Sequence, residues 1–216
     1  MAPGASVVTP EEVGASLKVS RETTVCLTQY VERLKKWNPH INLVSPRSLD
    51  EVWTRHVLDS GQLLDLAPET ARAWWDLGSG GGLPAMIVAI LARERRPALH
   101  VSAVESDTRK CAFLSETARE LGLDLTVKRT RIERLNGPVA DVLTARALAS
   151  LDRLLAYAND LLNPGGVAIF PKGAGAEREL TDARNRWHYD YARVESVTDD
   201  RAAIFCFTEI RCAGRG

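Results

Sequence analysis

The sequence predicts an α/β fold with a mostly parallel β-sheet, a C-terminal antiparallel strand and an N-terminal helical extension. From residue 71 onward, short apolar runs alternate with helical stretches of about 12 residues, which is the pattern of βαβ units. Before residue 71, the apolar residues recur with helical spacing. We therefore expect a helical cap over residues 1–70 and an α/β domain over residues 71–216, packed as one compact unit.

The helical extension carries its own start and stop signals. Thr9 precedes Pro10 and two glutamates, which is typical of a helix N-terminus. Apolar residues then recur at three- and four-residue steps over residues 20–37, so a helix is expected there, ended by Asn38-Pro39. A further helix is expected over residues 49–66.

The α/β part begins with the strand expected over residues 73–77. The next strands are expected over residues 99–104, 125–127, 139–143 and 167–171, and the helices over residues 84–95, 108–121, 151–162 and 177–187. Two final strands, 189–197 and 203–211, are separated by the polar segment Thr198-Asp199-Asp200. Such a connection suits an antiparallel hairpin, which would end an otherwise parallel sheet.

Composition limits the function classes. The chain has 216 residues, 45% of them hydrophobic and 26% charged, so it can bury a substantial core. Its longest apolar run, residues 83–92, is too short to cross a bilayer, and residues 1–10 lack the features of a secretory signal. We therefore expect a cytoplasmic protein without membrane contact. The four cysteines are scattered and the histidines are not clustered, so neither a disulfide framework nor a metal site is expected.

Charge is balanced, with 28 basic and 28 acidic residues. This balance argues against tight, non-specific binding to a nucleic-acid backbone, because generic coat proteins are basic overall. It leaves room for an RNA substrate bound by charges gathered on one face.

A glycine-rich loop follows the first expected strand, as Asp76-Leu77-Gly78-Ser79-Gly80-Gly81-Gly82. Glycines allow a sharp turn and a close approach of backbone to ligand. The dinucleotide fingerprint Gly-x-Gly-x-x-Gly fails here, because its last position would be Leu83 or Ala85. Glu105 follows the next strand, where a carboxylate can accept hydrogen bonds from both ribose hydroxyls.

Loop, strand and acid in this order are similar to the S-adenosylmethionine pocket of Rossmann-like class I methyltransferases. We therefore expect S-adenosyl-L-methionine as the cofactor, with Gly80 and Glu105 among the residues that bind it. A tight turn without a ligand, and a solvated surface acid at Glu105, are the alternatives.

Further segments resemble one family, the bacterial small-subunit rRNA guanine-N7 methyltransferases, also called glucose-inhibited division protein B. The matching segments lie in family order from about residue 27 to residue 173. They are Trp37-Asn38, Ile41-Asn42-Leu43, Arg55-His56-Val57-Leu58-Asp59-Ser60, the glycine loop through Pro84, Arg109-Lys110, Phe113-Leu114, Arg131-Ile132-Glu133, Thr144-Ala145-Arg146-Ala147, Asn163-Pro164-Gly165-Gly166 and Lys172-Gly173. The sequence departs from the family pattern at Ala85 and Glu105, where glycine and aspartate are usual.

The resemblance implies transfer of a methyl group to N7 of one guanine in 16S rRNA, the nucleotide numbered 527. It implies that Gly78 and Leu83 line the cofactor pocket and that Ile132 and Glu133 frame the adenine. Arg146 is expected at the cofactor or target-base end of the cleft, and is our candidate catalytic residue. Guanine N7 carries a lone pair and no proton, so in-line placement, without a general base, is the expected mechanism.

The partner implied is 16S rRNA, within the small ribosomal subunit or an assembly intermediate, and a monomer is the default expectation. The candidate RNA-binding residues are Arg55, His56, Arg109, Lys110 and Lys172. A further basic stretch is Lys128-Arg129-Thr130-Arg131, with Arg134 beyond it. Such cations contact phosphates without reading sequence. For each, a solvated surface charge is the alternative, and Arg55-His56 with Asp59 could instead form a polar pair within one helix.

Other functions remain open at this point. One is an S-adenosylmethionine-dependent methyltransferase acting on another RNA, a small molecule or a protein. Another is a nucleotide-binding module without catalysis, which the intact loop and acid disfavour.

Overall fold

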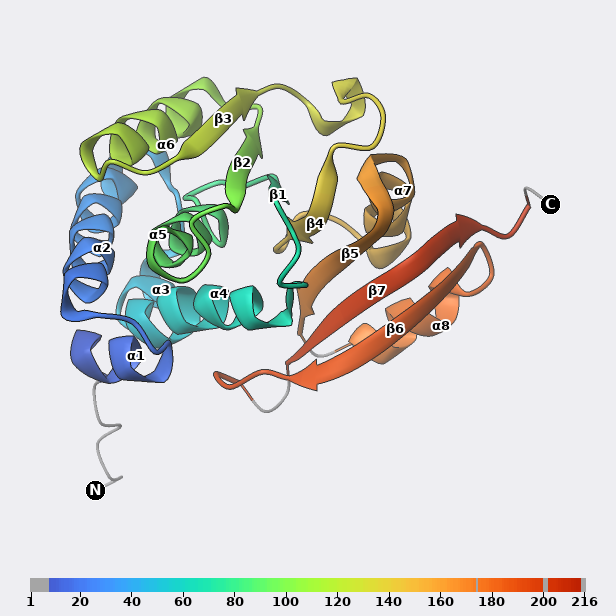
Figure 1. Cartoon of the computed structure of the whole chain (residues 1–216), viewed down its shortest axis with the longest axis horizontal. Coiled ribbons are helices and arrows are strands. Elements are labelled where there is room, and N and C mark those ends of the chain that lie inside the picture. The colour runs from blue at the N-terminus through green and yellow to red at the C-terminus, as the bar shows by residue number, and fades with distance from the viewer. Residues whose placement is uncertain (1–7, 174, 200–201, 215–216) are drawn as a thin grey trace.

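The computed structural model describes residues 8–173, 175–199 and 202–214. Among them, seven strands form one sheet in the order β3-β2-β1-β4-β5-β7-β6 (Figure 1). The strands β1 to β5 are parallel, and β7 runs antiparallel to both of its neighbours. The predicted fold class is therefore confirmed. The strand bounds are β1 (Ala73–Leu77), β2 (His100–Glu105), β3 (Leu125–Arg129), β4 (Ala140–Ala145), β5 (Leu162–Lys172), β6 (Trp187–Glu195) and β7 (Ala203–Cys212).

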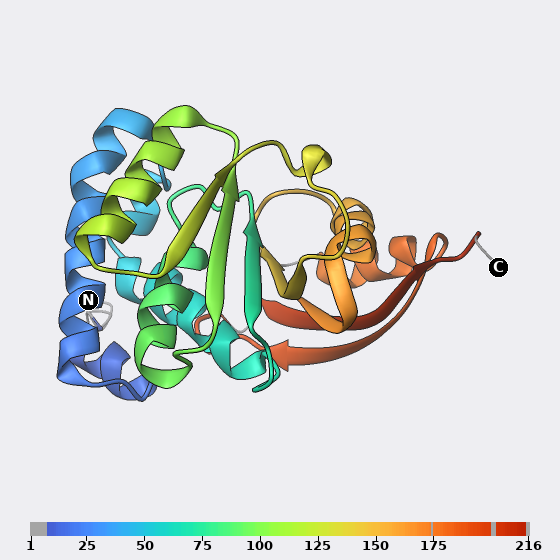
Figure 2. The ribbon, with the colours of Figure 1, turned by 45° about the horizontal axis from the view of Figure 1, so that its top comes forward.

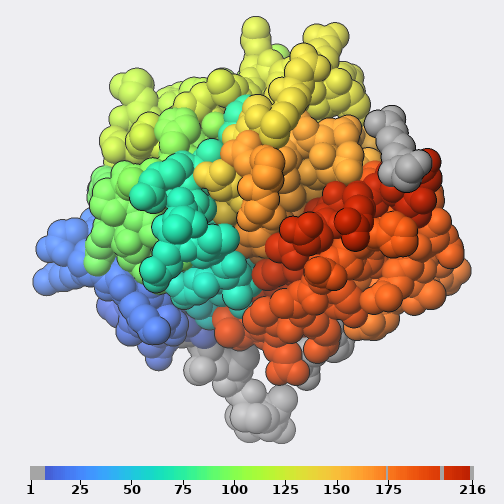
Figure 3. Space-filling model, turned by 45° about the vertical axis from the view of Figure 1, so that its right-hand side comes forward, coloured from blue at the N-terminus to red at the C-terminus, as the bar shows by residue number. Residues whose placement is uncertain are grey.

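The last strand of the chain lies inside the sheet rather than at its edge. β7 pairs with β5 through Ala168 and Phe207, and with β6 through Tyr191 and Phe207. β6 precedes β7 in the chain but forms the outer edge. The two strands run together along one side of the molecular surface, orange to red in Figure 3.

Helices cover both faces of the sheet, in two layers (Figure 2). On one face lie α2 (Arg21–Ile41), α5 (Ala85–Arg95) and α6 (Thr108–Glu120), and on the other lie α7 (Leu151–Leu161) and α8 (Ala176–Ala183). Successive side chains of a strand point to opposite faces of the sheet, so each strand contributes residues to both layers. Val142 of β4 packs in the first layer, and its neighbour Leu143 packs in the second.

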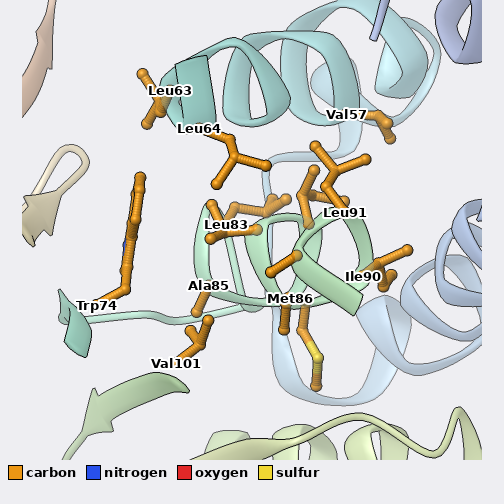
Figure 4. Close-up of a cluster of buried hydrophobic side chains, with 14 of the residues drawn as sticks. Val57, Leu63, Leu64, Trp74, Leu83, Ala85, Met86, Ile90, Leu91 and Val101 are labelled. Carbon is orange, nitrogen blue, oxygen red and sulfur yellow. The ribbon is translucent and has the colours of Figure 1, made fainter. Parts of the chain in front are cut away.

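The first eight residues of α5 are apolar on every side of the helix, and they are enclosed on every side. The eight consecutive residues 85–92 are all buried. Trp74 and Val101 of the sheet lie on one side of this helix, and Leu63 and Leu64 of the N-terminal helices lie on the other (Figure 4). This helix directly follows the glycine loop, so its burial fixes the position of the loop.

The N-terminal helices depart from the prediction at one stop signal. Asn38-Pro39 does not end the helix, because α2 continues to Ile41. Pro39 lies in the last turn, where it has no backbone N–H to donate to the carbonyl four residues earlier, yet the helix continues past it for two residues. The helix ends instead where Asn42 adopts a left-handed conformation, with φ 48°. The Asn38 side-chain oxygen then accepts hydrogen bonds from the backbone of Leu43 and Val44, at 2.8 and 2.9 Å.

The single helix predicted over residues 49–66 is interrupted in the structure. It is replaced by α3 (Pro46–Leu49), the π-helix η1 (Trp53–Leu58), α4 (Asp59–Gly61) and the 3₁₀-helix η2 (Gln62–Leu66). Apolar periodicity does not distinguish these helix types here, because each segment is only three to six residues long, too short to show a difference in residues per turn. The first helix, α1 (Pro10–Ser16), begins as predicted, with the Thr9 hydroxyl accepting a hydrogen bond from the backbone of Glu12.

The helix predicted over residues 177–187 ends early. α8 stops at Ala183, and Trp187 is the first residue of β6. Trp187 is buried, and its indole Nε1 donates to Asp152 Oδ1 at 2.9 Å. This contact with α7 is not visible in the local sequence. The short 3₁₀-helix η3 (Ile132–Arg134) lies between β3 and β4.

The N-terminal helices and the sheet share one apolar cluster, in which Leu27 and Leu34 lie with Trp74 and Ile87. The division into a cap over residues 1–70 and an α/β domain over residues 71–216 stays a prediction. Within the described part of the chain, no helix combines the length and apolar character needed to cross a membrane.

Candidate active site

A cleft of about 1570 Å³ opens at the carboxyl ends of β1, β4 and β5. In parallel α/β sheets, this end of the strands is where ligands bind. The sequence-predicted residues that line the cleft are Arg55, His56, Gly78, Gly80, Leu83, Arg146 and Lys172. The turn between β6 and β7, including Ser196 and Thr198, forms a further wall that sequence reasoning did not identify.

The glycine loop needs its glycines for backbone geometry. Gly78 and Gly80 have φ values of 67° and 56°, in the left-handed region that favours glycine. A Cβ at Gly78 would lie 2.6 Å from Leu148 Cδ1, whereas a Cβ at Gly80 would meet nothing closer than 3.8 Å. Gly80 also lines the cleft. An added side chain at Gly80 would therefore extend into open space where a ligand has room.

A hydrogen bond from α2 holds the glycine loop in place. The Tyr30 hydroxyl, fully buried, donates a hydrogen bond to the Gly81 carbonyl at 2.7 Å. Leu34 and Leu43 pack against the same glycine. In the sequence, Tyr30 belongs to the apolar stripe of α2, and its phenol oxygen is the signal that this position has a polar partner.

Glu105 ends β2 and binds the glycine loop directly. Its Oε2 accepts a hydrogen bond from the Gly80 backbone at 3.0 Å, and its Oε1 accepts from Ser106 and Asp107 at 2.6 and 2.9 Å. Glu105 itself is not among the residues that line the cleft. The contact fixes the spacing between the ends of β1 and β2, and the expected ribose contact stays a prediction.

Asp76 lies fully buried at the end of β1. Its Oδ1 accepts a hydrogen bond from the Thr144 hydroxyl at 2.9 Å, and this hydroxyl accepts one from Trp74 Nε1 at 3.0 Å. Its Oδ2 has no hydrogen-bond partner among the described residues. Burial raises the pKa of Asp76 to about 6, against the opposing effect of nearby hydroxyls. Asp76 is not among the residues that line the cleft, and its hydrogen bond to Thr144 holds the end of β1 against β4.

Arg146 follows β4 and is held by three groups of η1 and α4. Its Nη1 donates to the Arg55 carbonyl at 3.1 Å and to Asp59 Oδ2 at 3.4 Å, and its Nη2 donates to His56 Nδ1 at 2.9 Å. The polar pair that the sequence left open, within one helix, is not what forms. Arg55 instead pairs with Glu51 at 3.5 Å, while Asp59 pairs with Arg146.

His56 is buried, and its Nε2 lies 2.9 Å from Ser48 Oγ. Burial and the Arg146 guanidinium lower the pKa of His56 to about 4. The ring is therefore neutral at physiological pH, with Nδ1 free to accept the hydrogen bond from Arg146 and Nε2 donating to Ser48. Such a ring orients the guanidinium and adds no charge to the cleft.

The remaining predicted residues do not line the cleft. Glu133, on η3, accepts hydrogen bonds from the Tyr157 hydroxyl and from Arg153. Ile132 packs against the second apolar layer. Arg109 and Lys110 lie at the start of α6, where their backbone amides donate to Asp107 Oδ1 at 2.8 and 3.1 Å.

Lys172 lines the cleft but is already paired. Its Nζ lies 2.8 Å from Glu179 Oε2 and 3.3 Å from the Ala149 carbonyl. The side chain is 12% exposed. The ion pair joins the end of β5 to α8.

The sheet order, the glycine loop after β1 and the acid at the end of β2 define the class I methyltransferase fold. The ribosomal protein L11 methylase from Lactobacillus delbrueckii subsp. bulgaricus shares this fold, with a TM-score of 0.55. The match covers 70% of this chain and 76% of that one, at 20% sequence identity.

Sequence comparison then gives the family. The family GidB, described as rRNA small subunit methyltransferase G, matches residues 24–204, and the chain belongs to it. A relative from Ruegeria sp. (strain TM1040), named Ribosomal RNA small subunit methyltransferase G, is 54% identical over 87% of this chain and 91% of its own length. A relative of the same name from Ruegeria pomeroyi is 48% identical over 90% of this chain and 95% of its own length. The resemblance inferred from the motifs is confirmed.

Proposed function

We propose that this chain transfers a methyl group from S-adenosylmethionine to N7 of a guanine in 16S rRNA, at the position numbered 527. The observation that supports this most strongly is the cleft that runs from the glycine loop to Arg146, in a chain of the rRNA small subunit methyltransferase G family. The cleft, at about 1570 Å³, exceeds the volume typical of a drug-sized ligand site, so it has room for a cofactor and a base together.

The residues fit S-adenosylmethionine. Gly80 lines the cleft and leaves space for a ligand against its backbone. The proposed cofactor-binding residues are Gly78, Gly80, Leu83, Glu105, Ile132, Glu133 and Arg146. When bound, the cofactor supplies a methyl group already activated by its sulfonium sulfur.

The chain then has to place the acceptor and keep water out. N7 of guanine needs no deprotonation, so no general base is required. Arg146 is the proposed catalytic residue, because it lies in the cleft with its guanidinium held by η1 and α4. Neutral His56 serves as a hydrogen-bond acceptor for that guanidinium rather than as a base.

The acceptor RNA is proposed to contact Arg55, His56, Arg109, Lys110 and Lys172. These residues differ in how free they are. Arg109 is exposed and has no ion pair among the described residues, so it can neutralise a phosphate. His56 and Lys172 already have close partners, so an RNA contact there would compete with His56–Arg146 and Lys172–Glu179. We propose that the protein acts as a cytoplasmic monomer on the small subunit or its assembly intermediate.

The deciding experiment is transfer of a labelled methyl group to small-subunit particles from cells that lack this modification. We expect label at one guanine of 16S rRNA, and none on particles that already carry the modification. Label on another RNA or on a small molecule, with none on 16S rRNA, would favour a methyltransferase with a different acceptor. Normal cofactor binding without transfer to rRNA would refute the proposal.

The assignment of Gly80 to the cofactor site can be tested with Gly122, which does not line the cleft, as the matched control. Gly80 and Gly122 have φ values of 56° and 62°, and a Cβ has room at both. Gly80→Ala and Gly122→Ala should therefore cost similar stability, about 1 kcal/mol each from backbone strain. Only Gly80→Ala should weaken S-adenosylmethionine binding measured by calorimetry, by roughly tenfold, because its methyl group enters the cleft. Equal affinities for the two variants would remove Gly80 from the site.

A further inference from the structure

Asp59 occupies a junction between three segments that are distant in the chain. It is the first residue of α4, directly after η1, and its side chain is 17% exposed at the cleft. Its Oδ2 accepts a hydrogen bond from Arg146 Nη1 at 3.4 Å, which joins it to the end of β4. The Arg146 side chain is itself only 20% exposed. Partly buried pairs of this kind are screened less by salt than surface pairs.

The other carboxylate oxygen of Asp59 holds the turn between β6 and β7. Asp59 Oδ1 accepts from the Thr198 hydroxyl at 2.9 Å and from the Ser196 hydroxyl at 3.4 Å. Gln62, one turn further on, donates to the same oxygen at 3.1 Å. The Gln62 Oε1 accepts a hydrogen bond from the Val197 backbone at 3.1 Å. One carboxylate and one amide therefore bind three consecutive residues of this turn.

Both groups that Asp59 holds, Arg146 and the Ser196–Thr198 turn, line the cleft. The Nε of Arg146 has no hydrogen-bond partner among the described residues, so this donor is available to a bound molecule. A guanidinium carries donors only, and guanine presents O6 as an acceptor where adenine presents an amino group. The direction of the Arg146 donors therefore matters for which base is accepted.

We propose that Asp59 is a positioning residue that fixes Arg146 and the Ser196–Thr198 turn against each other, and so sets the wall of the cleft that receives the acceptor guanine. The proposal rests on the proposed function. Asp59 does not touch the glycine loop residues in the described contacts, so it should affect cofactor binding only through Arg146, and less strongly than it affects transfer.

The test compares three variants of the full chain, each first shown to unfold at a denaturant midpoint near that of the native protein. Asp59→Asn keeps an oxygen that accepts from Thr198 and Ser196 but loses the charge that pairs with Arg146. Thr198→Val keeps the shape of the turn and removes one donor to Asp59. Asp65→Asn is the control, because Asp65 lies on the neighbouring η2 and pairs with Arg95, outside the cleft.

The measurements are the affinity for S-adenosylmethionine and the rate of methyl transfer to unmodified small-subunit particles. We expect Asp59→Asn to lower kcat for transfer roughly tenfold, and Thr198→Val roughly threefold. Cofactor affinity should fall clearly less than kcat in Asp59→Asn and stay within about twofold of native in Thr198→Val. Asp65→Asn should match the native protein in both measurements. A second acceptor, a particle with adenine at the target position, should gain relative to guanine in Asp59→Asn.

Three outcomes would overturn the inference. Native kcat in Asp59→Asn would show that Arg146 does not need this partner. An equal loss of cofactor affinity and transfer would make Asp59 part of the general structure of the cleft. Native kcat in Thr198→Val would remove the turn from the proposal. Failure of the proposed function is distinct, because the native protein itself would then transfer no methyl group to 16S rRNA.

Discussion

The phenol oxygen of Tyr30 offers a test of how the N-terminal helices support the glycine loop. Tyr30→Phe removes one atom from a fully buried contact, the 2.7 Å hydrogen bond to the Gly81 carbonyl. Leu34 and Leu43 lie close to the Gly81 backbone. Removing one partner of a buried hydrogen bond costs about 1–3 kcal/mol, because the other partner loses its compensation. The cavity left by one hydroxyl is too small to add much to that cost.

The assay is urea unfolding of the native protein and Tyr30→Phe, with the slope of the transition checked for constancy. We expect the free energy of unfolding to fall by about 1–3 kcal/mol. S-adenosylmethionine affinity should fall as well, because the Gly81 carbonyl is then free to turn and move the loop. Tyr191→Phe is the matched control, since Tyr191 is 38% exposed and its hydroxyl has no hydrogen bond in the described contacts. It should change stability by less than about 0.5 kcal/mol.

A loss below about 0.5 kcal/mol in Tyr30→Phe would refute the reasoning, since the two phenol deletions would then be equivalent. A loss of stability with unchanged cofactor affinity would show that the contact supports the fold but not the loop geometry.

Two further predictions concern pH and packing. The pKa of His56 is about 4 in the fold, below the ordinary 6.5, so the unfolded chain binds a proton between these values that the folded chain does not. The free energy of unfolding should therefore fall as the pH drops through this window, by up to about 3 kcal/mol. This part of the pH dependence should vanish in His56→Asn. Identical pH profiles of the native protein and His56→Asn would contradict the prediction. Leu64→Ala, at a fully buried site beside α5, should lower the free energy of unfolding in urea by about 2–5 kcal/mol. A loss below about 1 kcal/mol would show that the cluster in Figure 4 repacks around the gap.

Much of the fold was predictable because the relevant signals are local. The strand at residues 73–77 matches β1, since an apolar run ends at a glycine loop that must turn. Helix α8 was predicted to reach residue 187 because an apolar Trp187 fits a helical pattern. Its place in β6 depends on pairing with Cys212 of β7, a contact that is not visible in the local sequence. The prediction that Asn38-Pro39 ends the helix was wrong for a related reason, because the effect of Pro39 depends on how close it lies to the end of α2.

The site divides in the same way. The location of Gly80 and Arg146 at the cleft was predictable, because glycine loops and strand ends are recognisable from short segments. Tyr30 and Asp59 were not identified as site residues, because their partners lie 51 and 87 residues away. Periodicity identified Tyr30 as a core residue, which it is, but could not show that its hydroxyl meets the loop.

The position of β7 has a consequence for how the chain is completed during synthesis. Among the described residues, the outer edge of β5, residues 168–172, pairs only with residues 203–207 of β7, and β6 also pairs only with β7. A nascent chain that ends at residue 195 therefore contains β5 and β6 but lacks β7, the strand that lies between them. The sheet cannot be complete until β7 is present, because β7 supplies the backbone partners of Ile169 and Phe170 in β5. Until then the nascent chain presents an open, apolar strand edge, the kind of surface that chaperones recognise and that other chains can pair with.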